Sequence, residues 1–365
     1  MRPLAEILAQ LPERGLPARH ASEYVEYAQH EAFFYLAAAK RARLTQLKAR
    51  WAGRRPERVW ISANLAGMAC ELPGVDVAML EPGYFCDASA ESIARKRSEL
   101  AGSVVIVNNN DVGLQEAQLG YGEIVRHCED TVFIAWDWDN HHWLELSTFL
   151  AAHSDLYAPA HHENLFLLSR FNWLTCGPVY CASVQWPRRW LEQALPTLLN
   201  ARRNPAPLGM HIPYMPFRFR MQVVTTLNQF YPSVGFSDRN FHGRTPEDRL
   251  HEWCAHKLHW IVPVLNDVPI RIFDALITGG IPVIPESLRF VAPVDRLPRQ
   301  HVLFYGPQDI IDPRDLVARG NALFDAGGEA GIRERHELGL GQHHGDLRVQ
   351  QMLGYVEELL GGGVA

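Results

Sequence analysis

The chain has 365 residues, 47% of them hydrophobic, and this length predicts two domains of ordinary size. A net charge of −6 with 21% charged residues argues against a general nucleic-acid binder. There is no apolar run of about 18 residues and no apolar signal-like start, so we expect a cytoplasmic protein, with the inner face of the membrane as an alternative location. The six scattered cysteines form no CxxC pair and predict reduced thiols.

Residues 1–55 are predicted to form an N-terminal helical segment, because apolar residues between Tyr24 and Leu44 recur at a roughly helical period. The stretch from Lys40 to Arg58 is strongly basic, and Glu57 is its only acidic residue. Such a stretch is typical of a solvated helix face. The alternative is peripheral contact of residues 36–58 with an anionic membrane surface, where a lipid-linked acceptor would lie.

Short apolar strands alternate with helices from Arg58 onward, which predicts a mostly parallel sheet covered on both faces. Strands are expected at 59–62, 75–80, 104–107, 132–136, 156–158 and 178–182, with helices at 90–100 and 144–153. Ligands of such sheets bind beyond the carboxyl ends of the strands. Two of these ends are rich in polar residues, namely Asn108–Asp111 and Asp137–His142.

A helix and a Pro/Asn-rich break fill residues 186–207, so we place a domain boundary there, between domains at 56–205 and 206–365. The second domain opens with a strand at 208–213 and a loop that contains Arg218 and Arg220. The remaining elements expected before residue 260 are a helix at 221–230, a strand at 234–236 and a helix at 246–259.

Residues 260–286 then predict a strand at 260–265, a loop, a helix, a Gly279-Gly280 turn and a strand at 281–284. A strand at 301–305 and a helix at 315–324 follow. Arg271 and Asp274 lie in the first turns of the helix, where a cation beside the helix N-terminus favours an anion. A carboxylate one turn further can hold ribose hydroxyls, as in dinucleotide folds. The alternative is an ordinary αβ unit with a surface Arg–Asp pair.

This stretch resembles the donor-binding segment of GT-B glycosyltransferases, especially the CgeB-like and group 1 families. There a loop, an Arg, an acidic residue on the helix and a GG-I-P-V turn follow one another, and Asp274 stands where many members have Glu. The tail is also similar, because His343 and His344 precede Arg348 as a His-containing segment precedes an Arg in those families. The resemblance covers about residues 208–360. The N-terminal half lacks a clear Gly-rich first loop, so the acceptor side cannot be carried over.

The resemblance implies an α/β fold of two Rossmann-like domains that face each other across a cleft. The enzyme would move a sugar from a nucleotide-activated donor to a hydroxyl of a glycan or lipid-linked saccharide, without a metal or other cofactor. A CMP-activated acidic sugar such as Kdo is the alternative donor, and a non-catalytic GT-B-like binding subunit is the alternative function. The implied donor-binding residues are Arg218, Arg220, Asp267, Pro269, Arg271, Asp274, Gly279, Gly280, His344 and Arg348.

The candidate catalytic residues lie in the first domain and are Asp137, Asp139, His141 and His161. Asp137 or Asp139 would act as general base or as nucleophile, and one of the histidines would assist. The DxD spacing also suits Mn²⁺ or Mg²⁺ in a metal-dependent transferase, and the histidine pairs suit zinc in a hydrolase. A structural alternative is that Asp139 or Asn140 caps the following helix.

Overall fold

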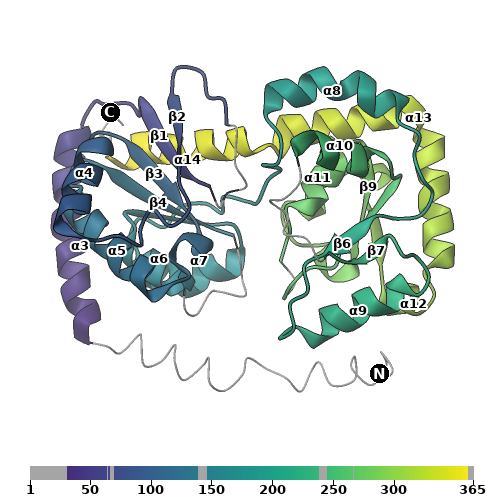
Figure 1. Ribbon diagram of the computed structural model, residues 1–365, viewed down its shortest axis with the longest axis horizontal. Coiled ribbons are helices and arrows are strands. Elements are labelled where there is room, and N and C mark those ends of the chain that lie inside the picture. The colour runs from purple at the N-terminus through teal and green to yellow at the C-terminus, as the bar shows by residue number, and fades with distance from the viewer. Residues whose placement is uncertain are drawn as a thin grey trace. The chain divides into compact units, whose positions relative to one another are not determined.

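The computed structural model (Figure 1) describes residues 31–63, 65, 70–138, 146–237, 245–265 and 267–360. Two compact units make up the chain. The N-terminal unit contains the described residues of Leu16–Tyr180 and the last helix, from Gly345 onward. The C-terminal unit contains those of Cys181–His344.

The N-terminal unit is built on a five-stranded sheet in which every pair of neighbouring strands is parallel. The strand order is β2-β1-β3-β4-β5. These strands are β1 (Arg58–Ser62), β2 (Asp76–Leu80), β3 (Val104–Val107), β4 (Val132–Asp137) and β5 (Leu156–Pro159). The helices are α3 (Glu31–Trp51), α4 (Ala90–Glu99), α5 (Gln115–His127), α6 (Thr148–His153), α7 (His162–Leu168) and α14 (Gly345–Leu360), with short 3-10 turns at Asn109–Val112 and Ser169–Phe171. Every residue of β3, β4 and β5 is buried, as continuous apolar strands covered on both faces should be.

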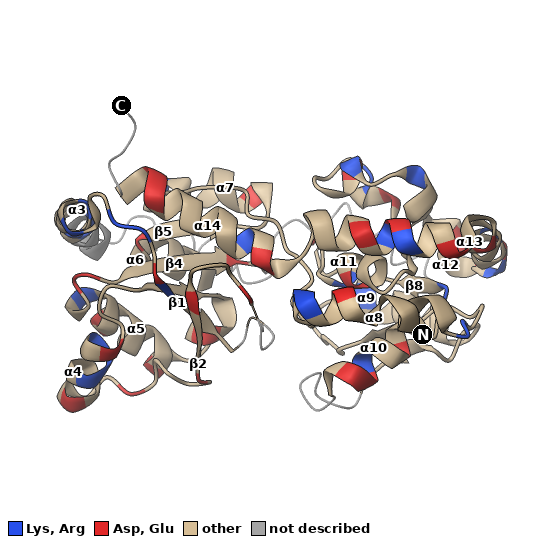
Figure 2. Cartoon of the chain, turned by 90° about the horizontal axis from the view of Figure 1, so that it is seen from above, with Lys and Arg blue, Asp and Glu red and all other residues tan. Residues whose placement is uncertain are grey.

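Two cations of the basic stretch fasten α3 to its own unit. Lys40 is buried and its Nζ donates to the carbonyls of Ala151 and Ala152, 2.9 and 3.1 Å away, at the end of α6. Arg43 forms a two-pronged ion pair with buried Asp155, with N–O distances of 2.7 and 2.9 Å. These two residues therefore serve the fold, while membrane contact by the exposed cations stays a prediction. Figure 2 shows that α4, another helix of this unit, carries both acidic and basic residues.

The C-terminal unit has a second parallel sheet. Its strands are β6 (Gly209–His211), β7 (Val234–Phe236), β8 (Leu258–Trp260), β9 (Ile281–Pro285) and β10 (Leu303–Tyr305). Two pieces of sheet, β10-β9-β8 and β6-β7, are joined by backbone hydrogen bonds from Leu208 to Leu258 and from Trp260 to Leu208, of 2.9 and 2.7 Å. The strand order is thus β7-β6-β8-β9-β10. The helices are α8 (Arg188–Asn200), α9 (Arg218–Asn228), α10 (Pro246–Cys254), α11 (Arg271–Ile277), α12 (Pro307–Ile311) and α13 (Arg314–Gln342), with 3-10 turns at Glu286–Leu288, Val294–Arg296 and Arg299–His301.

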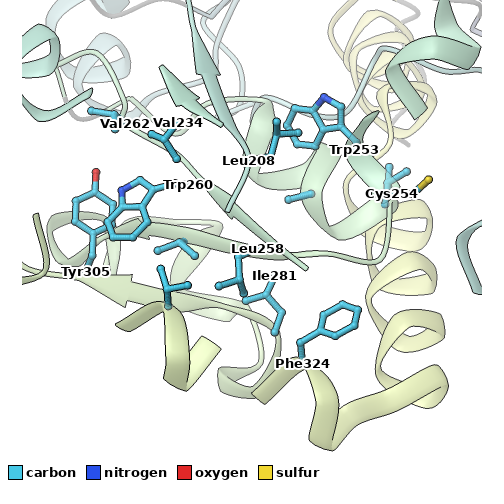
Figure 3. Close-up of a cluster of buried hydrophobic side chains, with 14 of the residues drawn as sticks. Leu208, Val234, Trp253, Cys254, Leu258, Trp260, Val262, Ile281, Tyr305 and Phe324 are labelled. Atoms are coloured by element: carbon cyan, nitrogen blue, oxygen red, sulfur yellow. The ribbon is translucent and has the colours of Figure 1, made fainter. Parts of the chain in front are cut away.

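The core of this unit lies between the sheet and its helices (Figure 3). Leu258 and Ile281, from adjacent strands, are fully buried there. Phe324 of α13 packs into the same cluster, as do Trp253 and Cys254 of α10. The apolar faces of α8, α9, α10, α11 and α13 are therefore used against one sheet.

Both units show the same strand order when their strands are numbered along the chain, namely 2-1-3-4-5. This is a doubly wound order, and the direction of winding reverses between the first and third strands. The switch points are thus the carboxyl ends of β1 and β3 in one unit and of β6 and β8 in the other. The α/β class with parallel sheets is confirmed.

The units differ from the expected boundaries in two respects. The change of unit lies at Tyr180–Cys181, because α8 packs on the C-terminal core through Leu191 and Leu198. The last helix, α14, belongs to the N-terminal unit, since it packs against α3.

One predicted strand is absent, and three further elements have bounds that differ from those predicted. Residues 178–182 form no strand. The strand expected at 260–265 is β8, which begins earlier, at Leu258, because Leu208 pairs with it. The helix expected at 246–259 therefore ends earlier, at Cys254. The helix expected at 315–324 extends to Gln342 and is interrupted at Gly328, whose φ is +52°. Among the described residues, no helix has the length and apolarity required to cross a membrane. All six cysteines are free thiols, as predicted.

Candidate functional site

The switch point of the N-terminal unit is lined by hydroxyl, amide and carboxylate groups. Ser62, the last residue of β1, donates to the carboxylate of Asp111 over 2.5 Å. Asp111 also accepts from the backbone of Asn108 at 2.8 Å, which makes a capping box of the turn after β3. The polar residues predicted after this strand therefore connect β1 and β3 at their carboxyl ends.

Asp137 ends β4 on the same edge and is fully buried. One of its carboxylate oxygens accepts from the hydroxyl of Tyr157 and, at 2.8 Å, from the side-chain amide of Asn164. The other oxygen has no hydrogen-bond partner in the described part of the chain. Burial and the Asp137 carboxylate together raise the pKa of Tyr157 well above its usual value, so its hydroxyl remains a donor. The carboxylate is thus held in one orientation.

His161 lies beside Asp137, since its Nε2 is 2.7 Å from the carbonyl of Trp138. The structure therefore brings together two of the four predicted catalytic residues. The other two, Asp139 and His141, lie outside the described residues. Among the residues that are described, no three His, Cys, Asp or Glu side chains form a group suited to a metal ion.

The switch point of the C-terminal unit is cationic instead. Arg271 donates from Nη1 to the carbonyl of Met210 in β6. Buried Arg220 donates from Nε to the carbonyl of Val262, just after β8, and from Nη1 to Ile212, both at 2.9 Å. The two predicted phosphate ligands thus meet at the ends of β6 and β8.

His211 joins these two strand ends. Its Nδ1 donates to the carbonyl of Gly209 at 2.6 Å and its Nε2 accepts from the amide of Val262 at 3.0 Å. Burial and the charges of Arg271 and Arg220 hold its pKa well below the usual value, so the ring is neutral. Because its Nε2 already accepts a hydrogen bond from Val262, this histidine positions the strand ends and leaves the charge to the arginines.

The pKa values of both guanidiniums are lowered. Burial and the charge of Arg220 lower the pKa of Arg271 to about 10, against a raising effect of Asp274. Burial lowers the pKa of Arg220, and Tyr214 and Asp267 oppose this shift. Asp267 is buried in the loop after β8, where exposed Leu265 has a φ of +45°. A non-glycine residue in this region is strained, and such strain is common at binding sites.

Asp274 is fully buried and does not lie at the surface of the site. One carboxylate oxygen accepts from the side-chain amide of Gln185. Burial raises its pKa to about 7, although Gln185, Arg271 and Arg249 favour the charged form. Its predicted contact with a ribose or sugar stays a prediction.

The glycine pair lies at the opposite edge of the sheet, where α11 ends and β9 begins. Gly279 has a φ of +75° and its amide bonds to the carbonyl of Leu276 at 2.8 Å, which closes the helix. A side chain on Gly280 would overlap the ring of His259. The pair therefore has a structural requirement of its own, away from Arg271.

The remaining predicted donor residues are scattered. Exposed Arg218 begins α9, and Pro269 accepts from the amide of Ile272 at 3.1 Å before α11. His344 is buried and its Nε2 contacts the carbonyl of Trp186 at 2.9 Å. Arg348 lies on α14, which belongs to the other unit.

Sequence reasoning missed several residues of these edges, among them Tyr157, Asn164, Gln185 and His211. His211 carried a usable signal, because it lies in the strand predicted at 208–213, shortly before Arg218 and Arg220. The other three carried none, since their partners are 20, 27 and 89 residues away in the chain.

Comparison with known proteins gives little further guidance. No family model and no curated protein matches the chain. Among solved structures, it is similar to the catalytic domain of starch synthase IV from Arabidopsis thaliana bound to ADP and acarbose. The identity is 10% and the TM-score 0.39, over 79% of this chain and 83% of that chain. This likeness is too remote to indicate a fold or a function for the chain.

Proposed function

We propose that the chain is a glycosyltransferase of the GT-B type, which moves a sugar from a nucleotide-activated donor to a hydroxyl of a glycan or lipid-linked saccharide. The observation that carries this proposal is the pair Arg220 and Arg271 at the switch point of the C-terminal sheet. Ligands of doubly wound sheets bind at this point, and two guanidiniums select an anionic one. The donor diphosphate supplies such a group.

The proposed sugar transfer requires positive charge beside the nucleoside phosphate that leaves. A guanidinium has five N–H donors, and the described residues use one of those of Arg271 and two of those of Arg220. The remaining donors would bind the donor phosphates and stabilise the charge that develops as the sugar departs. The bonds to Met210, Val262 and Ile212 hold both side chains in place beforehand.

Asp137 is proposed as the catalytic carboxylate or as the residue that fixes the neighbouring Asp139. Its complete burial favours the second role, and it also favours the alternative of a non-catalytic binding subunit. A metal-dependent DxD transferase would add Mn²⁺ or Mg²⁺ at the same carboxylates. These alternatives make different predictions for turnover and for added metal.

The decisive experiment is a thermal-shift screen of the protein with UDP-, GDP-, dTDP- and CMP-sugars and with the free nucleotides, with and without Mn²⁺. Arg271→Ala is measured beside the wild type. Arg296→Ala is the matched control, because Arg296 is 72% exposed. A ligand that binds only the folded state raises its stability, by about 2.7 kcal/mol at a hundredfold excess over Kd.

A shift with one nucleotide that persists in Arg296→Ala and disappears in Arg271→Ala supports the donor site and identifies the donor, including a CMP-activated acidic sugar. A rise in the unfolding midpoint with a nucleotide-sugar that the protein does not cleave supports the alternative of a non-catalytic binding subunit. If no nucleotide shifts the wild type in either condition, the proposal is overturned.

A further inference from the structure

A second group of cations lies at the other edge of the C-terminal sheet, far along the strands from Arg220 and Arg271. Three cations surround the ring of Phe324 on α13. Arg335 and Arg203 place their guanidinium carbons 5.0 and 5.3 Å from its centroid, and Lys257 places its Nζ at 5.8 Å. Phe324 itself is buried beside Leu258 and Ile281, near the amino ends of β8 and β9 (Figure 3). We call this group, with His259, the amino-edge cluster.

Among the residues that the structure describes, only one of these cations has an acidic partner. Lys257 forms an ion pair with Asp325 at 2.6 Å. Arg203 and Arg335 form no ion pair with any described residue, although exposed Glu334 acts on Arg335 from a distance. Arg335 is 1% exposed, so its charge is buried and no acidic side chain of the described residues contacts it. Burial and the neighbouring Arg203 lower the pKa of Arg335 to about 10, which shows that the arrangement opposes its charge.

The backbone meets only part of the hydrogen-bonding capacity of the cluster. Arg335 donates from Nε to Gly279 at 2.9 Å, and Arg203 donates to Thr278, Leu198 and His256 at 2.8–3.2 Å. Nη2 of Arg335, Nε of Arg203 and both ring nitrogens of His259 have no hydrogen-bond partner among the described residues. Buried polar atoms that lack a hydrogen-bond partner are rare in folded proteins, and each of them destabilises the folded state.

Glycines make room for these side chains. A Cβ on Gly279 would lie 3.1 Å from Nη2 of Arg203, and one on Gly331 would lie 3.1 Å from Nη1 of Arg335. Gly280 allows the backbone to approach the ring of His259 in the same way. Arg203 and Lys257 are only partly buried, so they are the members of the cluster that an ion from solvent can reach.

We propose that the amino-edge cluster binds a small oxyanion of the phosphate type, at a site separate from the donor site. The anion would pair with Arg203 and Arg335 and accept from the N–H groups that lack a protein acceptor, with neutral His259 as a further donor. This proposal does not depend on the glycosyltransferase assignment.

The test is thermal unfolding and calorimetric titration with inorganic phosphate, at constant ionic strength with chloride as the replaced anion. Arg203→Gln and Arg335→Gln remove one guanidinium each. Arg202→Gln and Arg333→Gln are the matched controls, because each is the exposed neighbour of a cluster residue. All variants are also prepared in the Arg271→Ala background, which removes phosphate binding at the donor site.

We expect a saturable rise in the unfolding midpoint for the Arg271→Ala protein and for both controls. Arg203→Gln and Arg335→Gln should raise the phosphate Kd at least tenfold. If Arg335→Gln does not fold, the half-buried Arg203 still provides the comparison. A phosphate effect that is unsaturable, or equal in Arg203→Gln and Arg202→Gln, would be the general effect of this salt on folding and would overturn the proposal.

Discussion

Replacement of Asp274 by Asn should stabilise the C-terminal unit, and by an amount that depends on pH. Asp274 is fully buried, and its pKa is raised from 3.8 to about 7. Between these two values the unfolded chain is charged at this residue while the folded chain keeps the proton. The folded state therefore binds more protons than the unfolded state, and its stability falls as pH rises from about 4 to about 7.

The size of the effect follows from the shift. At about 1.36 kcal/mol per pH unit, the difference between 3.8 and about 7 amounts to about 4 kcal/mol above pH 7. From pH 5 to pH 8 the penalty should grow by about 2–3 kcal/mol. Asn carries no charge, and its amide can donate to Oε1 of Gln185, which has no hydrogen-bond partner among the described residues. The variant should therefore lack this pH dependence.

Urea unfolding of wild type and Asp274→Asn at pH 5, 6, 7 and 8 measures the difference directly. Glu329→Gln, on the exposed side of α13, is the control for loss of one negative charge. A stability difference between wild type and Asp274→Asn that is the same at pH 5 and at pH 8 would refute the reasoning, because the carboxyl group would then titrate alike in both states.

Three further predictions concern the elements that shape the two units. Gly279→Ala should destabilise the protein by about 1–3 kcal/mol, because its φ is +75° and a Cβ would lie 2.6 Å from Ile332. Gly341→Ala on the same unit should instead be neutral or stabilising by up to about 1 kcal/mol, since no atom of the described residues lies within 4 Å of the Cβ that alanine adds; equal effects in urea unfolding would contradict both. Asp155→Asn should cost about 3–5 kcal/mol, because it leaves the half-buried guanidinium of Arg43 without its ion pair, and proteolysis should then cut α3 sooner than in wild type. Unchanged resistance to protease would show that α3 is held by its apolar contacts alone. Tyr157→Phe should cost about 1–3 kcal/mol, because it removes a donor from the buried carboxylate of Asp137. Calorimetry of the variant measures this loss, and an unfolding midpoint equal to that of wild type would mean that Asp137 finds another donor.

The strands of the N-terminal unit could be predicted because their signal is local. Val104–Val107 is a run of four apolar residues that are all buried, and its predicted bounds are those of the structure. The strand β8 could not be predicted in place, because His259 interrupts its apolar run and its position is set by Leu208, fifty residues earlier. Pairing across that distance outweighs the local preference for helix.

Some residues of the candidate site could also be predicted from local sequence, and others could not. Arg220 and Arg271 were identifiable as cations near strand ends, and the parallel topology then places them together. The burial of Asp274 was not identifiable, because the residue that covers its carboxylate, Gln185, precedes it by 89 positions. His344 and Arg348 stand four residues apart in the sequence, yet the change of unit falls between them.

The two units share one strand order but carry different side chains at their switch points. Both sheets have the strand order 2-1-3-4-5, so each has its switch point at the carboxyl ends of its first and third strands. The side chains at the two switch points can differ although the topology is the same. In the C-terminal unit the edge offers Arg220, Arg271 and neutral His211, a set that favours an anion. In the N-terminal unit it offers Asp111, Asp137 and amide groups, a set that favours hydroxyl groups. Under the proposed function, the cationic edge would suit the phosphate-bearing donor and the other edge the hydroxyl-bearing acceptor.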